Sequence, residues 1–501
     1  MQPENSRLAR NSIFNPKGGT MNQEERDHLI LQTGNAQAFP YWKDRSWKHY
    51  PFACEGAEEY YTLPRCAGWH PGNESQSWTI WGHLKAEESG KRYYFINIYN
   101  YNVAGKLLGF HWHLLLVTDV SEKKRYVQRR YHFRPLPSLF RPPFDIKEGD
   151  LDITYRPRGS SADRWYAKKD SSGNLIPFEY RLEATGNEKS GDRMALSVDL
   201  EALKPPLIIG GMDYHGKVTM FAQRDTFSLS FTRFKMQGTL ELSGKTEHIE
   251  GIAWAGLQWA PHHFGKKNHP LRRIKHTQFL MQLSNGWDLN LWRQYDTLRD
   301  NRIMPFSGIS AVFEDNTIAT TNNYELEPIS FYRNPGTAKP LIHHAPKDHY
   351  YSYATRLTIP EWDADLIISP ILDDNTMSLF VEYLIGPTEI RGTVRGKEVY
   401  GVGNIEATKV WHQDHELIRM MQTILKNLPD QSFHGDRKSI QRRLINDLEE
   451  VLTAVQVGDK SWAKRLLKAD LEVIEDKIRE EGTGVPTASL SSLYRDLMGR
   501  L

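Results

Sequence analysis

The chain has 501 residues, of which 39% are hydrophobic and 25% are charged, and its formal net charge is +2. This length is enough for two or three domains with full cores, and the composition is that of a globular protein. The small net charge gives no electrostatic argument for binding to nucleic acid or to an anionic membrane, and we expect neither as a partner.

The N-terminal segment MQPENSRLARNSIFNPKGG contains no apolar stretch of the kind that signal peptides carry. Nor does any apolar run in the chain approach the roughly 20 residues needed to span a bilayer. We therefore expect a cytoplasmic protein without a membrane span, in which residues 1–49 form a tail and lead-in. The only cysteines are Cys54 and Cys66, and two cysteines in such a chain are more often free thiols than a disulfide.

Alternation of apolar and polar residues predicts an almost wholly β region from about residue 77 to about residue 408. Turns rich in Gly, Asn and Asp separate the strands, and no helices lie between them. This pattern is typical of antiparallel barrels or sandwiches. We predict two consecutive β-domains, at residues 50–217 and 218–411. The clearest strands are 77–86, 93–102, 111–120, 216–223, 227–245, 277–295, 351–360, 364–372 and 388–408.

A stretch from Phe227 to Trp292 is the most informative part of the chain. Two strand-like runs flank a segment that is rich in Trp, His and Gln and reads HIEGIAWAGLQWAPHHF at 248–264. A barrel interior lined in this way can enclose an apolar ligand and place a few polar groups against it. We expect strand alternation to break after Trp254, so that the following side chains leave the barrel wall.

From His412 onward the spacing of apolar residues changes to that of helices. Pro429-Asp430 and Gly458-Asp459 punctuate the pattern, which predicts a helical C-terminal region at residues 412–501. Two interpretations stay open for it. Its charged residues are the solvated faces of a structural appendage, or it is a bundle through which the chain forms a homodimer or docks a partner.

These strands resemble a lipocalin-like two-barrel family that includes carotenoid hydratase (hydroxyneurosporene synthase), kievitone hydratase and lipocalin-like Diels–Alderases. The similarity covers roughly residues 60–410 and implies two consecutive lipocalin-like barrels or sandwiches followed by the helical appendage. The motifs that carry it are WTIWGHL at 78–84, HWHLLLVTDV at 111–120, GTLELSG at 238–244, the GIAW turn at 251–254 and the strand pair at 388–408.

The resemblance also identifies a difference at the acid of the family. Its hydratase-like members carry an Asp after the Gly-x-Ala-Trp turn, as the natural proton donor to an alkene, where this chain has Gly256. Hydration here would need another carboxylate, such as Glu382 or Glu406, buried with a raised pKa. A pericyclic reaction would need no acid, because holding the reactive conformer supplies much of the rate.

The remaining polar residues give no metal or nucleophile signature. His262, His263 and His276 lack the spacing of metal ligands, and we expect no metal and no other cofactor. His111 and His113 lie on one face of a strand, and we interpret them as buried, hydrogen-bonded barrel residues. There is no Gly-x-Ser-x-Gly elbow and no Gly-x-Gly-x-x-Gly loop, which argues against a serine hydrolase and against nucleotide binding.

We therefore expect a natural-product type of enzyme that binds an apolar isoprenoid- or polyketide-derived molecule between its barrels and directs its cyclisation, isomerisation or hydration. The alternative is a non-catalytic carrier or interaction protein with the same pocket and a helical docking module. The catalytic candidates are His83, Gln258 and His276. The substrate-binding candidates are Trp78, Trp81, Trp254, Trp259 and His262.

Overall fold

The computed structural model describes residues 43–104, 108–135, 143–156, 162–188, 191–210, 217–218, 226–261, 274–296, 302–329, 331–334, 349–352, 354–372, 374–379, 382–408, 414–426, 437–481 and 485–501. The described residues fall into two compact units. The larger unit takes residues from 22–324 and 385–408, and the smaller unit takes residues from 325–384 and 409–501. The predicted fold class, mainly β with two curled half-barrel sheets and helices at the C-terminus, is confirmed.

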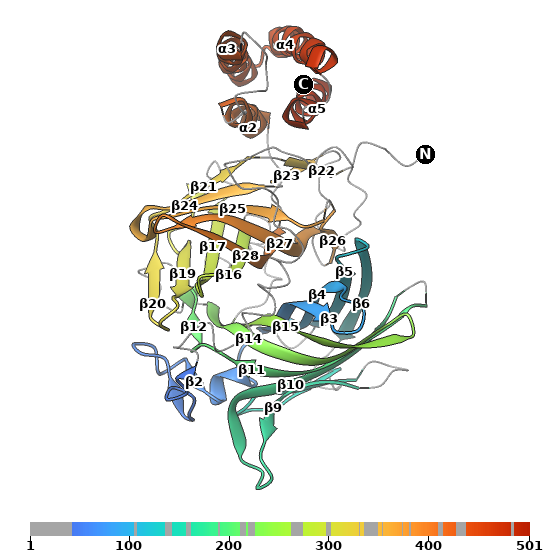
Figure 1. Cartoon of the computed structure of the whole chain (residues 1–501), viewed down its shortest axis with the longest axis vertical. Coiled ribbons are helices and arrows are strands. Elements are labelled where there is room, and N and C mark those ends of the chain that lie inside the picture. Colours follow the sequence, from blue (N-terminus) through green and yellow to red (C-terminus); the bar gives the residue numbers. More distant parts are fainter. Residues whose placement is uncertain are drawn as a thin grey trace. The chain divides into compact units, whose positions relative to one another are not determined.

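The first sheet lies in the larger unit and curls into a half-barrel (Figure 1). It has 13 antiparallel strands among the described residues, eleven of them on one continuous path. In hydrogen-bonding order they are β6 (Lys124–Pro135), β5 (Leu108–Asp119), β4 (Arg92–Ala104), β3 (Ser75–Ala86), β15 (Lys245–Ala260), β14 (Thr226–Leu242), β11 (Arg193–Ala202), β10 (Leu175–Asn187), β9 (Asp163–Lys169), β8 (Asp152–Tyr155) and β7 (Phe144–Ile146), with β12 (Leu207–Ile208) and β13 (Lys217–Val218) beside β14.

Strands β14 and β15 belong to this first sheet although they follow the predicted domain boundary at residue 217. β14 pairs with β11, and β15 pairs with β3 from near the start of the sheet. The expected break in alternation after Trp254 is wrong, because β15 stays in register with β3 as far as Ala260. The domain boundaries themselves stay predictions.

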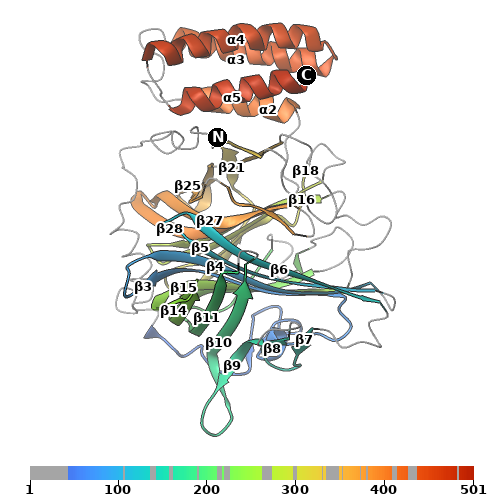
Figure 2. The ribbon, with the colours of Figure 1, turned by 90° about the vertical axis from the view of Figure 1, so that its right-hand side faces the viewer.

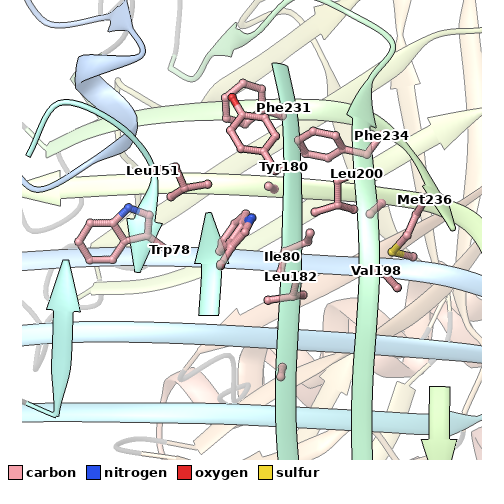
Figure 3. Packing of buried hydrophobic residues seen from close by; sticks show 14 of the residues in the cluster. Trp78, Ile80, Leu151, Tyr180, Leu182, Val198, Leu200, Phe231, Phe234 and Met236 are labelled. Atoms are coloured by element: carbon pink, nitrogen blue, oxygen red, sulfur yellow. The ribbon is translucent and has the colours of Figure 1, made fainter. Parts of the chain in front are cut away.

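One face of the first sheet forms the apolar core of the half-barrel (Figure 3). Successive side chains of a strand point to opposite faces, so alternate residues of β3, β10 and β11 enter this core, and β14 contributes residues on both sides of a register shift between Phe231 and Phe234. The opposite face is thereby left to carry a different set of side chains. The labelled core residues are Trp78, Ile80, Leu151, Tyr180, Leu182, Val198, Leu200, Phe231, Phe234 and Met236.

A second sheet contributes six paired strands and a short edge strand to the larger unit. Its centre is the antiparallel triplet β17, β16 and β28. The first three residues of β27, 382–384, fall in the smaller unit. In order the strands are β20 (Ile318–Thr321), β19 (Gly308–Val312), β17 (Asp288–Asp296), β16 (Ile274–Leu283), β28 (Lys397–Thr408) and β27 (Glu382–Val394), with β18 (Arg302–Ile303) beside β17.

A buried ionic cluster fastens the second sheet to the first inside the larger unit. Lys204, Arg233 and Asp288 are all fully buried. Nε of Arg233, on β14, donates to Oδ1 of Asp288, on β17, at 2.9 Å, and Nζ of Lys204 lies 3.3 Å from Oδ2 of Asp288. Burial lowers the pKa of Lys204 to about 8. Charge-assisted hydrogen bonds of this kind are strong and directional, so the cluster fixes how the two sheets face each other.

The smaller unit begins with short strands. β24 (Thr355–Ile359) pairs with β21 (Glu325–Pro328) and with β25 (Ala364–Pro370), and β26 (Thr376–Ser378) pairs with the first residues of β27. β22 (Phe331–Asn334) and β23 (His349–Ser352) form a hairpin. The 3-10 turn η7 (Pro360–Trp362) also belongs to this unit, whereas β1 (Phe52–Ala53), β2 (Thr62–Leu63) and the 3-10 turn η4 (Arg65–Ala67) belong to the larger unit.

Four helices, among the described residues, follow at the end of the chain. They are α2 (Asp414–Lys426), α3 (Arg437–Gln456), α4 (Lys460–Glu481) and α5 (Val485–Arg500), and they lie side by side (Figure 2). One apolar cluster joins them and consists entirely of residues from these helices and the last residue of the chain. None of the described helices is long and apolar enough to cross a membrane.

Candidate functional site

Strand alternation separates the predicted site residues onto the two faces of the first sheet. Trp78 and Trp259 point into the apolar core. Trp81 and His83 of β3, and Trp254, Gly256 and Gln258 of β15, lie on the other face by parity. We call this second surface the inter-sheet face, because strands of the second sheet cover it, as the contacts below show.

Two tryptophans form the apolar part of the inter-sheet face. Trp81 and Trp254 are directly opposite each other on β3 and β15, and their rings are nearly parallel, with centroids 6.1 Å apart and 11° between the planes. Both side chains are fully buried. Neither indole N–H has a hydrogen-bond partner among the described residues.

Gly256 leaves open space beside this pair. A Cβ built on Gly256 would have no atom of the described residues within 4 Å, apart from its chain neighbours. Thr79 of β3 and Ser230 of β14 are its partners in register, so two hydroxyl groups flank it on the same face. Gln258, two residues further along, is half-buried. The position where the resemblance places the acid of the family is therefore a gap bordered by polar groups.

His83 links the two sheets by a hydrogen bond from its ring N–H. Its Nε2 lies 3.0 Å from the carbonyl oxygen of Gly403 on β28; a carbonyl only accepts, so Nε2 carries the hydrogen. Nearby, the hydroxyl of Tyr94 donates to Oδ1 of Asn404 at 2.6 Å. Burial lowers the pKa of His83 to about 4, so this imidazole is neutral at physiological pH.

The second sheet turns a polar face toward the inter-sheet face. Nε2 of Gln282 donates to the carbonyl oxygens of Thr232, at 2.7 Å, and Ala253, at 3.2 Å. Ile252 of β15 packs on Val402 of β28. Gln278 lies on the same face of β16 as Gln282, and its Nε2 donates to Oδ1 of Asn290 at 3.3 Å. The amide of Gln282 is thus buried against β15, next to Trp254 in the chain, whereas Gln278 pairs with Asn290 within the second sheet.

His276 lies next to Glu406, one of the two carboxylates that the sequence analysis considered as a possible acid. Its Nε2 lies 3.3 Å from Oε1 of Glu406, and its Nδ1 lies 2.7 Å from the hydroxyl of Thr408. The imidazole stacks on Trp292, with ring centroids 5.1 Å apart. An imidazole held between a carboxylate and a hydroxyl can pass a proton in either direction. Glu382, the other carboxylate considered, belongs to the smaller unit and accepts a hydrogen bond from the hydroxyl of Tyr351.

Of the predicted set, only Trp81 and Trp254 are in direct contact across β3 and β15, and His276 lies six residues along β16 from Gln282, the residue that reaches β15. Trp81, Trp254, His83 and Gln258 share one face of the first sheet, and His276 shares a face of the second sheet with Gln282. The other two tryptophans have separate environments: Nε1 of Trp78 donates to the carbonyl of Ala67, and Trp259 stacks on His70. His262 and His263 lie outside the described residues.

A second buried polar cluster lies on the core face, at His113 and Asp163. Nε2 of His113 donates to Oδ1 of Asn97 at 2.8 Å, and burial lowers the pKa of His113 to about 3. Asp163 accepts two hydrogen bonds from Thr185, and burial raises its pKa to about 6. His111 is also buried and accepts the backbone N–H of Asn102. The interpretation of both histidines as buried and hydrogen-bonded is confirmed, whereas the role of Asp163 was not predicted.

No group of three or more His, Cys, Asp or Glu side chains able to hold a metal ion occurs in the part of the chain that the structure describes. The expectation that no metal or other cofactor is needed stays a prediction, since His262 and His263 lie beyond that part. Cys54 and Cys66 are both buried and free.

Two curled antiparallel half-barrels with a buried face between them define a lipocalin-like two-barrel protein. A family model described as AttH-like matches residues 56–408. The chain therefore belongs to the AttH-like family, and the two-barrel family predicted from the motifs is confirmed. No curated protein matches the chain.

Several solved structures are similar to this chain. A crystal structure assigned to AttH, from Nitrosomonas europaea, is 15% identical, with 71% of this chain and 98% of that chain covered and a TM-score of 0.53. Kievitone hydratase from Nectria haematococca is 13% identical over 70% and 92% of the two chains, with a TM-score of 0.49. CghA with Sch210972 is 11% identical over 68% and 89%, with a TM-score of 0.40. The first of these shows a shared fold.

Proposed function

We propose that this chain is a cofactor-independent, lipocalin-like enzyme that binds an apolar isoprenoid- or polyketide-derived molecule at the inter-sheet face and directs its cyclisation, isomerisation or hydration. The observation that carries the proposal is the buried Trp81–Trp254 pair next to the open space at Gly256. A site that is mostly aromatic, with a few polar groups converging on it, is the usual form of a small-molecule site.

In this proposal, the indole faces of Trp81 and Trp254 bind the reactive apolar chain of the substrate. If positive charge develops on the substrate, the face of each ring stabilises it by about 1–2 kcal/mol. If the reaction is pericyclic, the same rings hold the folded conformer in which the reacting carbons are close. Both routes need the ring faces, so Trp81 and Trp254 are the wall residues on which the proposal rests.

Proton transfer falls to the second sheet. His276, with Glu406 at one ring nitrogen and Thr408 at the other, is the acid–base candidate, and Gln258 orients a polar substituent. His83 is a positioning residue in this scheme, because its proton is used by Gly403. Contacts of Trp78, Trp259 and His262 with a substrate stay predictions. A carrier would need a wall but no proton relay, and the His276–Glu406 pair therefore favours the enzyme over the carrier.

The test is incubation of the full chain with linear isoprenoid alkenes and polyene esters in ¹⁸O-labelled water, followed by mass spectrometry and NMR. Hydration adds one labelled water, cyclisation or isomerisation changes the connectivity without changing the mass, and a carrier returns the ligand unaltered. The last result, with tight binding, would replace the enzyme by the carrier.

Variants locate the chemistry. We expect His276→Gln to lower turnover by about a hundredfold while binding changes little, as removal of a general acid or base does. The matched control is His248→Gln, since His248 also lies against a carboxylate, that of Glu88 at 2.6 Å, but on the surface. Equal losses in both variants would contradict the assignment of His276.

A further inference from the structure

Three accessible polar side chains of the inter-sheet face make no hydrogen bond of their own. Ser77 and Gln258 lie opposite each other on β3 and β15, and Thr79 lies opposite Gly256 on the same two strands. All four residues are half-buried, so part of their surface is accessible. The side chains of Ser77, Thr79 and Gln258 have no hydrogen-bond or ionic partner in the part of the chain that the structure describes. We call these four residues the polar strip.

The polar strip begins where the contacts of the second sheet end. Nε2 of Gln282 reaches the carbonyl oxygen of Ala253, and the next residue, Trp254, is fully buried. Gly256 follows Trp254 by two residues, which places it about 7 Å further along the strand. Gly256 and Gln258 are half-buried. The polar strip is therefore the accessible end of the inter-sheet face.

Ordinary exposure to solvent does not account for the composition of the polar strip. On the outer face of β10 and β11, in the same sheet, half-buried residues are charged and form ion pairs. Arg181 pairs with Glu183 and with Asp199, each at 3.1 Å. The polar strip is half-buried to a similar degree, but it carries two hydroxyl groups and one amide and no charge. Its neighbour on β4 is the apolar side chain of Ile98, opposite Thr79.

These groups restrict the part of a ligand that they can bind. A hydroxyl group and a carboxamide both donate and accept hydrogen bonds, and neither neutralises a charge. A carboxylate or an ammonium group bound there would lose water without gaining a counter-ion, which is strongly unfavourable. A hydrocarbon would cover the three polar side chains and leave them without partners, which is also unfavourable. A neutral hydroxyl group avoids both costs, because it can donate to one side chain and accept from another.

We propose that the polar strip binds a neutral, hydroxyl-bearing end of the ligand, with Ser77, Thr79 and Gln258 as its hydrogen-bond partners. This inference rests on the proposed function and narrows its substrate class to apolar molecules with an alcohol or polyol end. Ser77 and Thr79 lie about 7 Å apart along β3, so a ligand with two hydroxyl groups can contact both. The strip thereby fixes which end of an apolar chain lies at the accessible end of the inter-sheet face.

The test compares ligands that differ only at one end. Geraniol, farnesol and geranylgeraniol supply the hydroxyl group at three chain lengths. The matched hydrocarbons, carboxylic acids and primary amines replace it by hydrogen, by an anion and by a cation. Dissociation constants come from equilibrium dialysis of labelled ligands against the full chain at neutral pH. We expect the best alcohol to bind about tenfold or more tightly than each of its three analogues, because polar groups left unpaired and charges left without a counter-ion both weaken binding.

Variants assign the preference for the alcohol to the strip. Ser77→Ala and Thr79→Val remove a hydroxyl group with little change in shape, and each should lower the ratio of alcohol to hydrocarbon affinity about threefold or more. The matched control is Thr239→Val. Thr239 is also half-buried on the outer face of this sheet, but it lies on β14 opposite His248 and two residues from Glu241, away from the polar strip. Its replacement should leave the ratio unchanged.

A further variant tests the strip by a gain of binding. Gln258→Lys places a cation opposite Ser77, and we expect the preference to move from the alcohol to the carboxylic acid of the same chain length. A misfolded protein cannot produce this gain, so the result is informative even if Ser77→Ala or Thr79→Val fails to fold.

The outcomes separate this inference from the proposed function. Equal binding of alcohol and hydrocarbon, or an equal loss of preference in Thr239→Val, overturns the role of the polar strip and leaves the proposed function intact. Preference of the unaltered protein for the acid or for the amine overturns it as well. Failure of all four ligand series to bind at every chain length overturns the proposed function and this inference together.

Discussion

Gly251 and Gly256 lie on the same strand and yet meet opposite surroundings. A Cβ on Gly251 would come within 2.1 Å of the carbonyl oxygen of His83 on β3. A Cβ on Gly256 would meet no atom of the described residues within 4 Å. Gly251 is therefore needed for the close approach of β15 to β3, whereas Gly256 has no packing reason to lack a side chain. The open space at Gly256 is therefore better explained as room for a bound molecule than as a requirement of strand packing.

This contrast gives a prediction about two alanine variants. Gly251→Ala should lower the free energy of unfolding by about 1–3 kcal/mol, because the new methyl group overpacks the strand pair. Gly256→Ala should change it by less than about 0.5 kcal/mol. Urea unfolding of both variants measures the difference. A large loss in Gly256→Ala would show that the space beside it is not open.

Gly256→Asp extends this test to activity. The carboxyl would stand where hydratase-like members of the family carry their acid, and the open surroundings predict that the variant folds. If the wild type turns over an alkene of the panel without adding water, a gain of labelled water in the variant would show that the site supports hydration. Gly256→Asn is the matched control, since it fills the same space but supplies no acid.

At the scale of residues, the sequence identified one half of the candidate site better than the other. Trp81 and Trp254 were predicted from their strands and motifs. Gln282 and Asn290 were missed, because parity along one strand shows which side chains share a face but not which strand of another sheet covers them. Parity groups Gln278 and Gln282 with His276 on one face of β16, but only the contacts of Gln282 with Thr232 and Ala253 show that this face lies against the first sheet.

At the scale of elements, the helices followed their apolar periodicity closely. The turn predicted at Gly458-Asp459 separates α3 from α4. Trp462 of α4 is an exception, because it is large and apolar and yet 41% exposed. It lies in the first turn of the helix, where its backbone N–H bonds to the side chain of Asp459, and the guanidinium of Arg465 covers its ring.

A buried carboxyl group makes the helices sensitive to pH. Asp470 of α4 is fully buried and accepts the hydroxyl of Tyr494 of α5 at 3.2 Å. Burial, with Asp447 nearby, raises the pKa of Asp470 to about 8. The pKa of Asp470 is higher in the folded state than in the unfolded state. The contribution of this residue to the free energy of unfolding is therefore fully present below about pH 4 and is lost as the pH rises through 8.

We therefore expect Asp470→Asn to stabilise the helices, increasingly so at higher pH. The amide keeps a neutral group next to Tyr494, and the gain should grow by about 2–4 kcal/mol between pH 5 and pH 8. Thermal unfolding followed at 222 nm by circular dichroism measures it. The exposed Asp476 on the same helix gives the control Asp476→Asn, which should show no such trend. A pH-independent effect of Asp470→Asn would rule out titration of this group.

At the scale of the molecule, the two β regions and the helical end were predicted, but the boundary between the β regions cannot be located by strand pattern alone. β14 and β15 are buried on both faces over their middle residues, and nothing in the residues themselves identifies the strands that they pair with. Their assignment to the first sheet depends on pairing with β11 and β3, and period-two patterns carry no information about partners distant in sequence.

The helical region should be removable as a whole. Its apolar cluster draws only on residues from 417 to 501, so a chain that ends at residue 411 exposes none of it. We expect this shortened protein to remain folded and β-rich by circular dichroism. A chain that ends at residue 484 lacks only α5, exposes the apolar faces of the other helices and should be less soluble. Aggregation of the shorter chain alone would show that the β region depends on the helices.

The pairing of Ser75 with Ala260 across β3 and β15 has a consequence for synthesis on the ribosome. Strand β3 emerges early and can pair with β4 at once, but its other edge has no partner until β15 has been translated. Long-range pairing of this kind slows folding, and an unpaired strand edge invites aggregation. We expect Trp78, Trp81 and their neighbours on β3 to stay exposed in the nascent chain until β15 has been synthesised. The yield of the protein in cells should therefore depend on chaperones that bind before residue 260 is made.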